Sequence, residues 1–218
     1  MMIGSGSGGD GVGLGDAGNG GDVREAEGGR RRPARERLLE AAARRFYADG
    51  VAATGIDTIT AEAGVAKMSL YNNFASKADL VRAYLDARHE EWLGLYRARL
   101  ERAAGPREGV LAVFDAYADH AAFAYERGFR GCGLLNAAAE LPAGDQGRTV
   151  VRAHKEEVER LIAGHLERLA PDRPDEARAT AEHLAFLLEG AMARAGLEGD
   201  AERVLRARAL AEALLDRL

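Results

Sequence analysis

The chain has few of the residues that mark several classes of protein. Its 218 residues include one cysteine, Cys132, so no disulfide can form within the chain. No charged segment followed by an apolar run marks a signal peptide, and no stretch approaches the roughly 18 uninterrupted apolar residues of a membrane span. We therefore expect a cytoplasmic protein that has no membrane anchor.

Signals for catalysis and for metal binding are also absent from the sequence. It contains no P-loop, no nucleophile elbow and no paired-carboxylate motif. None of its five histidines stands four residues from another, and no cysteine cluster assists them. The run GSGSGG matches a dinucleotide-binding pattern, but no strand precedes it and no helix opens on it. We predict no enzymatic activity, no cofactor and no metal site.

Proline is scarce and glycine is unevenly distributed. There are only five prolines, and residues 1–29 hold about a dozen of the 27 glycines with few large apolar groups. Such a segment cannot offset the entropy lost on ordering, so we predict a disordered tail there. The remainder is rich in Ala, Leu, Arg and Glu, which favour helix, and 47% of the chain is hydrophobic. We expect an all-α fold.

The charge is negative overall but is unevenly placed. A net charge of −5 taken alone argues against binding to a polyanion. Residues 30–82, however, contain ten Lys and Arg against six Asp and Glu, so this segment is net positive. A basic segment on an acidic body is typical of a DNA-reading module joined to a separate ligand or partner domain.

The apolar spacing changes abruptly at Pro33 and becomes helical. It predicts three short helices, at about residues 33–49, 55–63 and 67–74. Thr54 with Asp57 three residues later has the form of a capping box and predicts the start of the second helix, which Gly64 ends.

A second capping box, Ser76 with Asp79, predicts a long fourth helix from Lys77 towards Arg102. Glycine and proline then divide the rest of the chain into further helical segments. These are predicted at about residues 107–127, 131–139, 146–170, 174–195 and 199–217.

Two short helices joined at Gly64 have the spacing of a helix-turn-helix, in which the second helix enters the major groove of DNA. The spacing makes Ile59 and Leu70 core positions. The side chains left to point outward are Lys67, Met68, Ser69, Tyr71, Asn72 and Asn73. Asparagine can pair with an adenine edge while lysine, serine and tyrosine hold phosphates. A helical hairpin with a merely polar face is the alternative.

The segment Arg35–Ala87 resembles the DNA-binding domain of the TetR family of bacterial regulators. The shared features are Ala42 and Phe46, the turn at Gly50, Thr54, Ile59, Ala63-Gly64-Val65, Lys67, Leu70-Tyr71, Phe74 and Ser76-Lys77. The resemblance implies a homodimer that binds a palindromic operator, usually represses, and is released by a small-molecule effector. It divides the chain into a tail at 1–29, a helix-turn-helix domain at 30–82 and a helical ligand-binding and dimerisation domain at 83–218.

Two positions depart from the family pattern. Thr60 replaces a usual alanine, and Ala66 replaces a usual serine, which removes an N-cap from the predicted recognition helix. By position, the resemblance assigns phosphate contacts to Lys67, Ser69, Tyr71 and Lys77. Thr54 is expected to cap and to touch the DNA backbone, and Met68, Asn72 and Asn73 are expected to reach base edges or phosphates. Arg30–Arg32 is either a minor-groove arm or a solvated tail.

By the same resemblance, the effector should lie among the middle helices. Candidate lining residues are Trp92, Tyr96, Phe114, Tyr117, Phe123, Cys132, Asn136, Phe186 and Met192. Ordinary core packing would also place aromatic residues at this spacing. Cys132 near Arg130 is either a redox or electrophile sensor or a packed small side chain.

The last two predicted helices carry long stripes of Ala and Leu, which suit either packing within the chain or an isologous interface between two copies. Two other classes of protein remain as alternatives. A general architectural protein would bind DNA whatever its sequence, and a helical enzyme or carrier would bind a small molecule without DNA. The second leaves the outward tyrosine and lysine residues unexplained.

Overall fold

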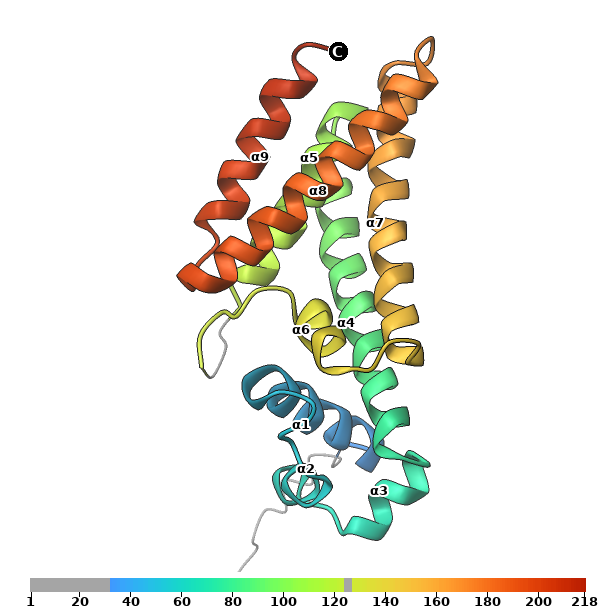
Figure 1. Ribbon diagram of the computed structural model, residues 1–218, viewed down its shortest axis with the longest axis vertical. Coiled ribbons are helices and arrows are strands. Elements are labelled where there is room, and N and C mark those ends of the chain that lie inside the picture. The colour runs from blue at the N-terminus through green and yellow to red at the C-terminus, as the bar shows by residue number, and fades with distance from the viewer. Residues whose placement is uncertain (1–31, 124–126) are drawn as a thin grey trace, which may run out of the picture. The chain divides into compact units, whose positions relative to one another are not determined.

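The computed structural model describes residues 32–123 and 127–218, which fold into a set of packed helices (Figure 1). The helices are α1 (Ala34–Asp49), α2 (Ile56–Ala63), α3 (Lys67–Asn73), α4 (Lys77–Leu100), α5 (Pro106–Ala121), α6 (Gly133–Glu140), α7 (Gln146–Leu169), α8 (Pro174–Glu198) and α9 (Glu202–Leu215). These two ranges contain no strand, and the all-α prediction is confirmed. The tail predicted for residues 1–29 and the residues Arg30 and Arg31 lie outside the described ranges.

The ends of the first helices follow from local chemistry. Gly50 ends α1 with φ of +94°, and Gly64 ends α2 in the left-handed conformation. The capping box predicted for α4 is confirmed, because Ser76 Oγ accepts a hydrogen bond from the backbone N–H of Asp79 at 3.1 Å. The cap predicted at Thr54 is wrong: Gly55 is the N-cap of α2, and no side chain caps this helix.

The long helix α4 joins two parts of the fold. At its beginning it packs on α1, and further along it packs on α5 and α7 (Figure 1). α7 also packs on α8, and α9 lies against α5 and α8, which completes a bundle. We call α1, α2 and α3 the head, and the helices from α5 onward the body.

The head and the body share one hydrophobic core. Buried residues continue from Leu38 and Leu70 in the head, along Leu80 and Leu85 of α4, to Trp92 among the body helices. The predicted domain boundary between residues 82 and 83 therefore falls inside a continuous helix. A shift of α4 within the body must consequently be felt by the head.

In the two described ranges, no helix combines the length and the low polarity that crossing a bilayer requires. Those ranges also contain no group of three His, Cys, Asp or Glu side chains arranged to hold a metal ion.

Candidate nucleic-acid interface

Helix α3 is fixed from inside by apolar contacts, and two arginines hold its end and the turn that precedes it. Leu70 is fully buried, and the Arg35 guanidinium lies 5.2 Å from the centre of the Phe74 ring. Arg37 Nη1 donates hydrogen bonds to the carbonyl oxygens of Ala63 at 2.8 Å and Gly64 at 3.1 Å. These bonds satisfy carbonyl groups at the end of α2 and hold the turn against α1.

The outward side of α3 carries most of the predicted contact residues. Met68 is 69% exposed and Tyr71 is 47% exposed, and Lys67 and Asn72 are exposed as well. Ser69, Asn73 and Lys77 are half-buried at the edges of this surface. Figure 1 places α3 at the end of the head that is farthest from the body. Seven of the eight predicted residues are thus at least partly exposed on α3 or at the start of α4.

Two of these residues already have partners within the head. Lys67 Nζ lies 2.8 Å from Asp57 Oδ1, and this hydrogen bond raises the pKa of Lys67. Asn73 Nδ2 donates to the backbone oxygen of Ser69 at 2.7 Å, so part of its amide is used to end α3. Within the described ranges, the side chains of Tyr71 and Asn72 have no hydrogen bond or ion pair that would compete with DNA.

Thr54 has a different position from the one predicted. Its side chain is only 2% exposed, and its hydroxyl donates to the carbonyl oxygen of Gly50 at 2.6 Å. The hydroxyl also lies 3.3 Å from the carbonyl oxygen of Arg45. Thr54 therefore braces the end of α1, and its hydroxyl is not presented to a phosphate group.

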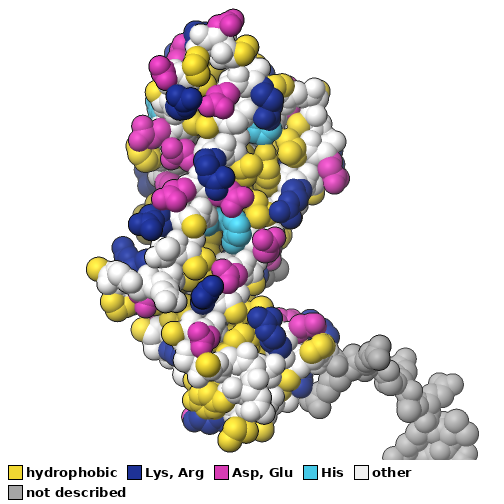
Figure 2. All heavy atoms as spheres, turned by 90° about the vertical axis from the view of Figure 1, so that its right-hand side faces the viewer, with side chains coloured by type: hydrophobic (Ala, Val, Ile, Leu, Met, Phe, Trp, Pro, Cys, Tyr) yellow, Lys and Arg dark blue, Asp and Glu magenta, His cyan; other side chains and the backbone are white. Residues whose placement is uncertain are grey.

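Many of the basic residues that gave the head its positive charge are paired internally. Arg44 Nε lies 2.6 Å from Glu62 Oε1, Arg45 binds the other oxygen of Glu62, and Arg32 pairs with Glu40 at 2.9 Å. Although burial opposes it, hydrogen bonds from the two arginines lower the pKa of Glu62. Figure 2 accordingly shows basic and acidic side chains intermingled along one face rather than one continuous basic patch.

The segment before and within α6 is hydrogen-bonded to the end of α1. Glu140 accepts from the backbone N–H groups of Val51 at 3.1 Å and Ala52 at 2.7 Å. Arg130 Nη1 donates to the carbonyl oxygens of Tyr47 at 2.8 Å and Ala48 at 2.7 Å. The sequence offered no signal for these bonds, because they join residues more than 80 positions apart.

The aromatic residues predicted to line an effector pocket are packed together in the body. Trp92 stacks on Tyr96 with ring centres 5.6 Å apart, and the Tyr117 ring centre lies 5.1 Å from that of Trp92. Phe114 is fully buried, and Cys132 is 8% exposed. The hollow beside Trp92, Tyr117 and Cys132 has a volume of about 10 Å³, which is room for no more than a single water molecule.

Polar groups are buried within this aromatic cluster. His154 Nδ1 lies 2.8 Å from His89 Nδ1, and His154 Nε2 lies 3.1 Å from the Tyr117 hydroxyl. Burial, together with the positive charge of Lys155, lowers the pKa of His154 to about 2, so the imidazole is neutral. Lys155 Nζ pairs with Glu189 at 2.7 Å and lies 3.6 Å from Cys132 Sγ.

Three of the other predicted lining residues lie away from the cluster. Phe186, predicted as a lining residue, is 66% exposed and so is not packed in the interior of the body. It lies on the outer side of α8, whereas Met192 of the same helix is fully buried. Phe123 is 38% exposed, and Asn136 donates a hydrogen bond to the carbonyl oxygen of Arg130 at 2.9 Å. Helical spacing alone did not distinguish the two sides of α8.

Comparison with known proteins identifies the family. Residues 38–84 match the sequence profile of the family described as "Bacterial regulatory proteins, tetR family". An aligned segment of 86 residues is 45% identical to the probable HTH-type transcriptional regulator ArpR of Pseudomonas putida, and covers 37% of this chain and 41% of that protein. A second aligned segment, of 64 residues, is 45% identical to the HTH-type transcriptional regulator TtgR of Pseudomonas putida and covers 30% of its length. The chain therefore matches less than half of each curated relative.

Solved structures extend the likeness to the body. A TetR-family transcriptional regulator from Streptomyces coelicolor is 34% identical, with a TM-score of 0.75, over 84% of this chain and 88% of that one. A TetR transcriptional regulator from Chloroflexus aurantiacus is 26% identical, with a TM-score of 0.72, over 84% and 94% of the two chains. Proteins of this kind are transcriptional regulators and not enzymes. The chain belongs to the TetR family of transcriptional regulators, and its helix-turn-helix is the part by which such proteins bind DNA.

Proposed function

We propose that this regulator binds a palindromic operator as a homodimer, represses transcription there, and is released when a small-molecule effector binds. The cytoplasm, where bacterial genomic DNA lies, is the place where we propose that it acts. We also propose that the helix-turn-helix unit of residues 30–82 carries operator binding and that residues 83–218 carry effector binding and dimerisation.

The observation that carries the proposal is the exposed face of α3. Met68, Tyr71 and Asn72 are all exposed on one short helix, which is costly for a surface that has no partner. An asparagine amide can read an adenine edge, and the tyrosine hydroxyl can hold a phosphate group. Lys77, at the first turn of α4, adds a cation beside this face. We propose these side chains, with Lys67, Ser69 and Asn73, as the DNA contacts.

Dimerisation is supported by the outer surfaces of α8 and α9. Phe186 is 66% exposed and Leu210 is 50% exposed, and both line a shallow hollow of about 350 Å³ together with Gly190 and Ala191. The opposite sides of the two helices, with Leu184 and Val204, are buried in the body. We propose that a second copy covers the outer apolar side in an isologous four-helix contact. Two heads would then face two half-sites of one operator.

Release by an effector requires that the head respond to the body. The shared core along α4 and the bonds of Glu140 and Arg130 to the end of α1 supply two physical connections. Suppose that the effector binds the arrangement with displaced heads more tightly than the operator-bound arrangement. A difference of about 1.4 kcal/mol in binding free energy then weakens operator binding about tenfold.

The experiment is selection of binding sequences from a random DNA pool, carried out with the full chain at two salt concentrations. Enrichment of one palindromic sequence is the expected result, and binding to it should weaken steeply with salt because counterions are released. Tyr71→Ala should abolish the enrichment, while Arg152→Ala, on an exposed part of α7, should leave it unchanged.

DNA binding without enrichment would favour an architectural protein over an operator-binding one. Absence of DNA binding at both salt concentrations would contradict the proposal. Light scattering of the same samples measures the molar mass of the protein in solution. The parent should have the mass of a dimer, and Phe186→Glu should have the mass of a monomer if the outer side of α8 forms the interface.

A further inference from the structure

A second cavity, separate from the aromatic cluster, lies at the junction of the head with α4. We call it the junction cavity, and its volume is about 820 Å³, within the range of small-molecule sites. Its lining includes Leu39, Ala43 and Tyr47 of α1, Ala87 and Arg88 of α4, and Phe123. α1 forms one wall and α4 forms another, so an occupant would touch the head and the body at once.

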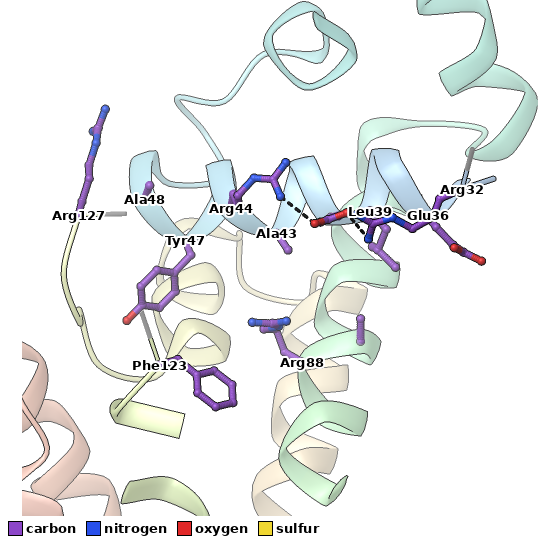
Figure 3. A pocket seen from close by; sticks show the side chains of 12 residues that line it. Arg32, Glu36, Leu39, Ala43, Arg44, Tyr47, Ala48, Arg88, Phe123 and Arg127 are labelled. Carbon is purple, nitrogen blue, oxygen red and sulfur yellow. Dashed lines mark hydrogen bonds and ion pairs between the residues drawn. The ribbon is translucent and has the colours of Figure 1, made fainter. Parts of the chain in front are cut away.

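The walls are apolar where α1 and α4 face each other. Figure 3 shows Tyr47 and Leu39 projecting from α1 into the space, with Phe123 on the far side. Ala43 and Ala87 also line the cavity, and their small side chains take up little of its space. An aromatic or short aliphatic body fits such walls, because it would bury apolar surface there.

The arginines of the rim are the groups that could hold an anion, and each of them also has an acidic partner. Four arginines and two glutamates line the cavity. Three of the arginines are held by acids of the head, since Arg32 and Arg44 pair with Glu40, and Arg127 pairs with Asp49 at 2.5 Å.

The fourth arginine, Arg88 of α4, is the group best placed to bind a ligand. Its Nη1 pairs with Glu91 at 2.9 Å, but its buried Nε has no hydrogen-bond partner among the described residues. Figure 3 shows its guanidinium directed towards α1, between Tyr47 and Ala43. Arg88 also borders the closed hollow beside Trp92 and His154, so it connects the cavity to the aromatic cluster.

We infer that the junction cavity binds a small amphipathic carboxylate, with its apolar body between α1 and α4 and its carboxylate on Arg88. The inference rests on the proposed function, because it names the chemical class and the site of an effector. An occupant would contact Leu39 and Ala43 of α1 on one side and Arg88 of α4 on the other. It would therefore alter the angle between α1 and α4, and with it the position of the head.

The experiment is calorimetry of the full chain without DNA, using three matched probes: phenylbutyrate, phenylbutylamine and phenylbutanol. Phenylbutyrate should bind and the amine should not, and the alcohol should bind at least about tenfold more weakly than the acid, because a charge-assisted hydrogen bond is lost. Arg88→Gln should reduce phenylbutyrate affinity by about the same factor, whereas Arg97→Gln, exposed elsewhere on α4, should not.

Two variants fill the cavity from opposite walls. Ala43→Trp on α1 and Ala87→Trp on α4 should each abolish phenylbutyrate binding, and circular dichroism identifies any variant that fails to fold. The inference is overturned if phenylbutyrate binds more weakly than about 1 mM, if the amine binds as tightly as the acid, or if the folded variants bind like the parent. Operator selection with the same protein is independent of these titrations, so failure of the inference and failure of the proposed function are distinguishable.

Discussion

Glu140, at the end of α6, accepts a hydrogen bond from the backbone N–H of Val51, 3.1 Å away and 89 positions earlier in the chain. The second carboxylate oxygen accepts from Ala52 at 2.7 Å. The turn between α1 and α2 lies outside any helix, so these two N–H groups have no partner in a helical ladder. A single carboxylate from the body thus holds the first turn of the head.

We predict that Glu140→Ala lowers the free energy of unfolding by about 1 kcal/mol and weakens operator binding severalfold, because the α1–α2 turn loses its acceptor. Chemical denaturation and titration of the selected operator measure the two effects. Glu156→Ala is the control, since that exposed carboxylate pairs only at the surface with Arg152 at 3.6 Å. Equal effects of the two substitutions would show that the Glu140 bonds have no role in fixing the head.

The two glycines of the head should differ in their tolerance of a side chain. Gly64→Ala should cost about 1 kcal/mol, because its left-handed conformation strains an L-residue but leaves the backbone unchanged. Gly50→Ala should cost at least about 2 kcal/mol, since its conformation is close to glycine-only.

The added methyl group at Gly50 would also lie 2.7 Å from Glu140 Oε1 and would displace that carboxylate. Urea unfolding of both variants compares them. A loss at Gly50 no larger than the loss at Gly64 would contradict the contact between Glu140 and the turn.

Prediction from sequence succeeded where the signal is local. The capping box of Ser76, the end of α2 at Gly64 and the exposed residues of α3 all follow from residues a few positions apart. Thr54 shows the limit of local reasoning. Its hydroxyl could accept from a backbone N–H of the helix ahead or donate to a carbonyl oxygen behind it, and in the structure it donates to Gly50.

The rest of the site depends on contacts between distant residues. The pairing of Arg45 with Glu62, which neutralises one cation of the head, joins residues 17 positions apart on two different helices. The bonds of Arg130 to Tyr47 and the opening between α1 and α4 depend on how α6 and α4 pack. The periodicity of α8 indicated an apolar helix but did not tell its buried side from the side that carries Phe186.

Lys77 provides a quantitative test of the DNA interface. It is half-buried at the start of α4, and no acid is paired with it in the described ranges. We predict that Lys77→Gln weakens binding to all DNA sequences alike and reduces the slope of log affinity against log salt by about 1 per head. Titrations at several salt concentrations measure the slope. The control is Arg152→Gln, and a Lys77→Gln slope equal to that of the parent would exclude a phosphate contact at this position.

His154 should make the fold sensitive to mild acid. Its pKa is lowered to about 2 by burial and by Lys155, so the folded chain keeps it neutral while the unfolded chain protonates it near the ordinary histidine pKa of 6.5. Below that pH the unfolded state binds the additional proton, and stability must fall as the pH falls. The expected loss from this residue alone is about 2 kcal/mol between about pH 6.5 and pH 5.

Carboxylates with lowered pKa values, such as Glu62 and Glu91, add to the loss only as the pH approaches 4.5, the ordinary pKa of a glutamate in the unfolded chain. The interval above pH 5 therefore isolates the histidines, including His165, whose pKa is lowered by burial and by Arg168. Denaturant unfolding of the parent and of His154→Gln across this interval is the measurement. The variant should show a shallower fall, since glutamine does not titrate, and parallel curves would mean that His154 is protonated in the folded chain.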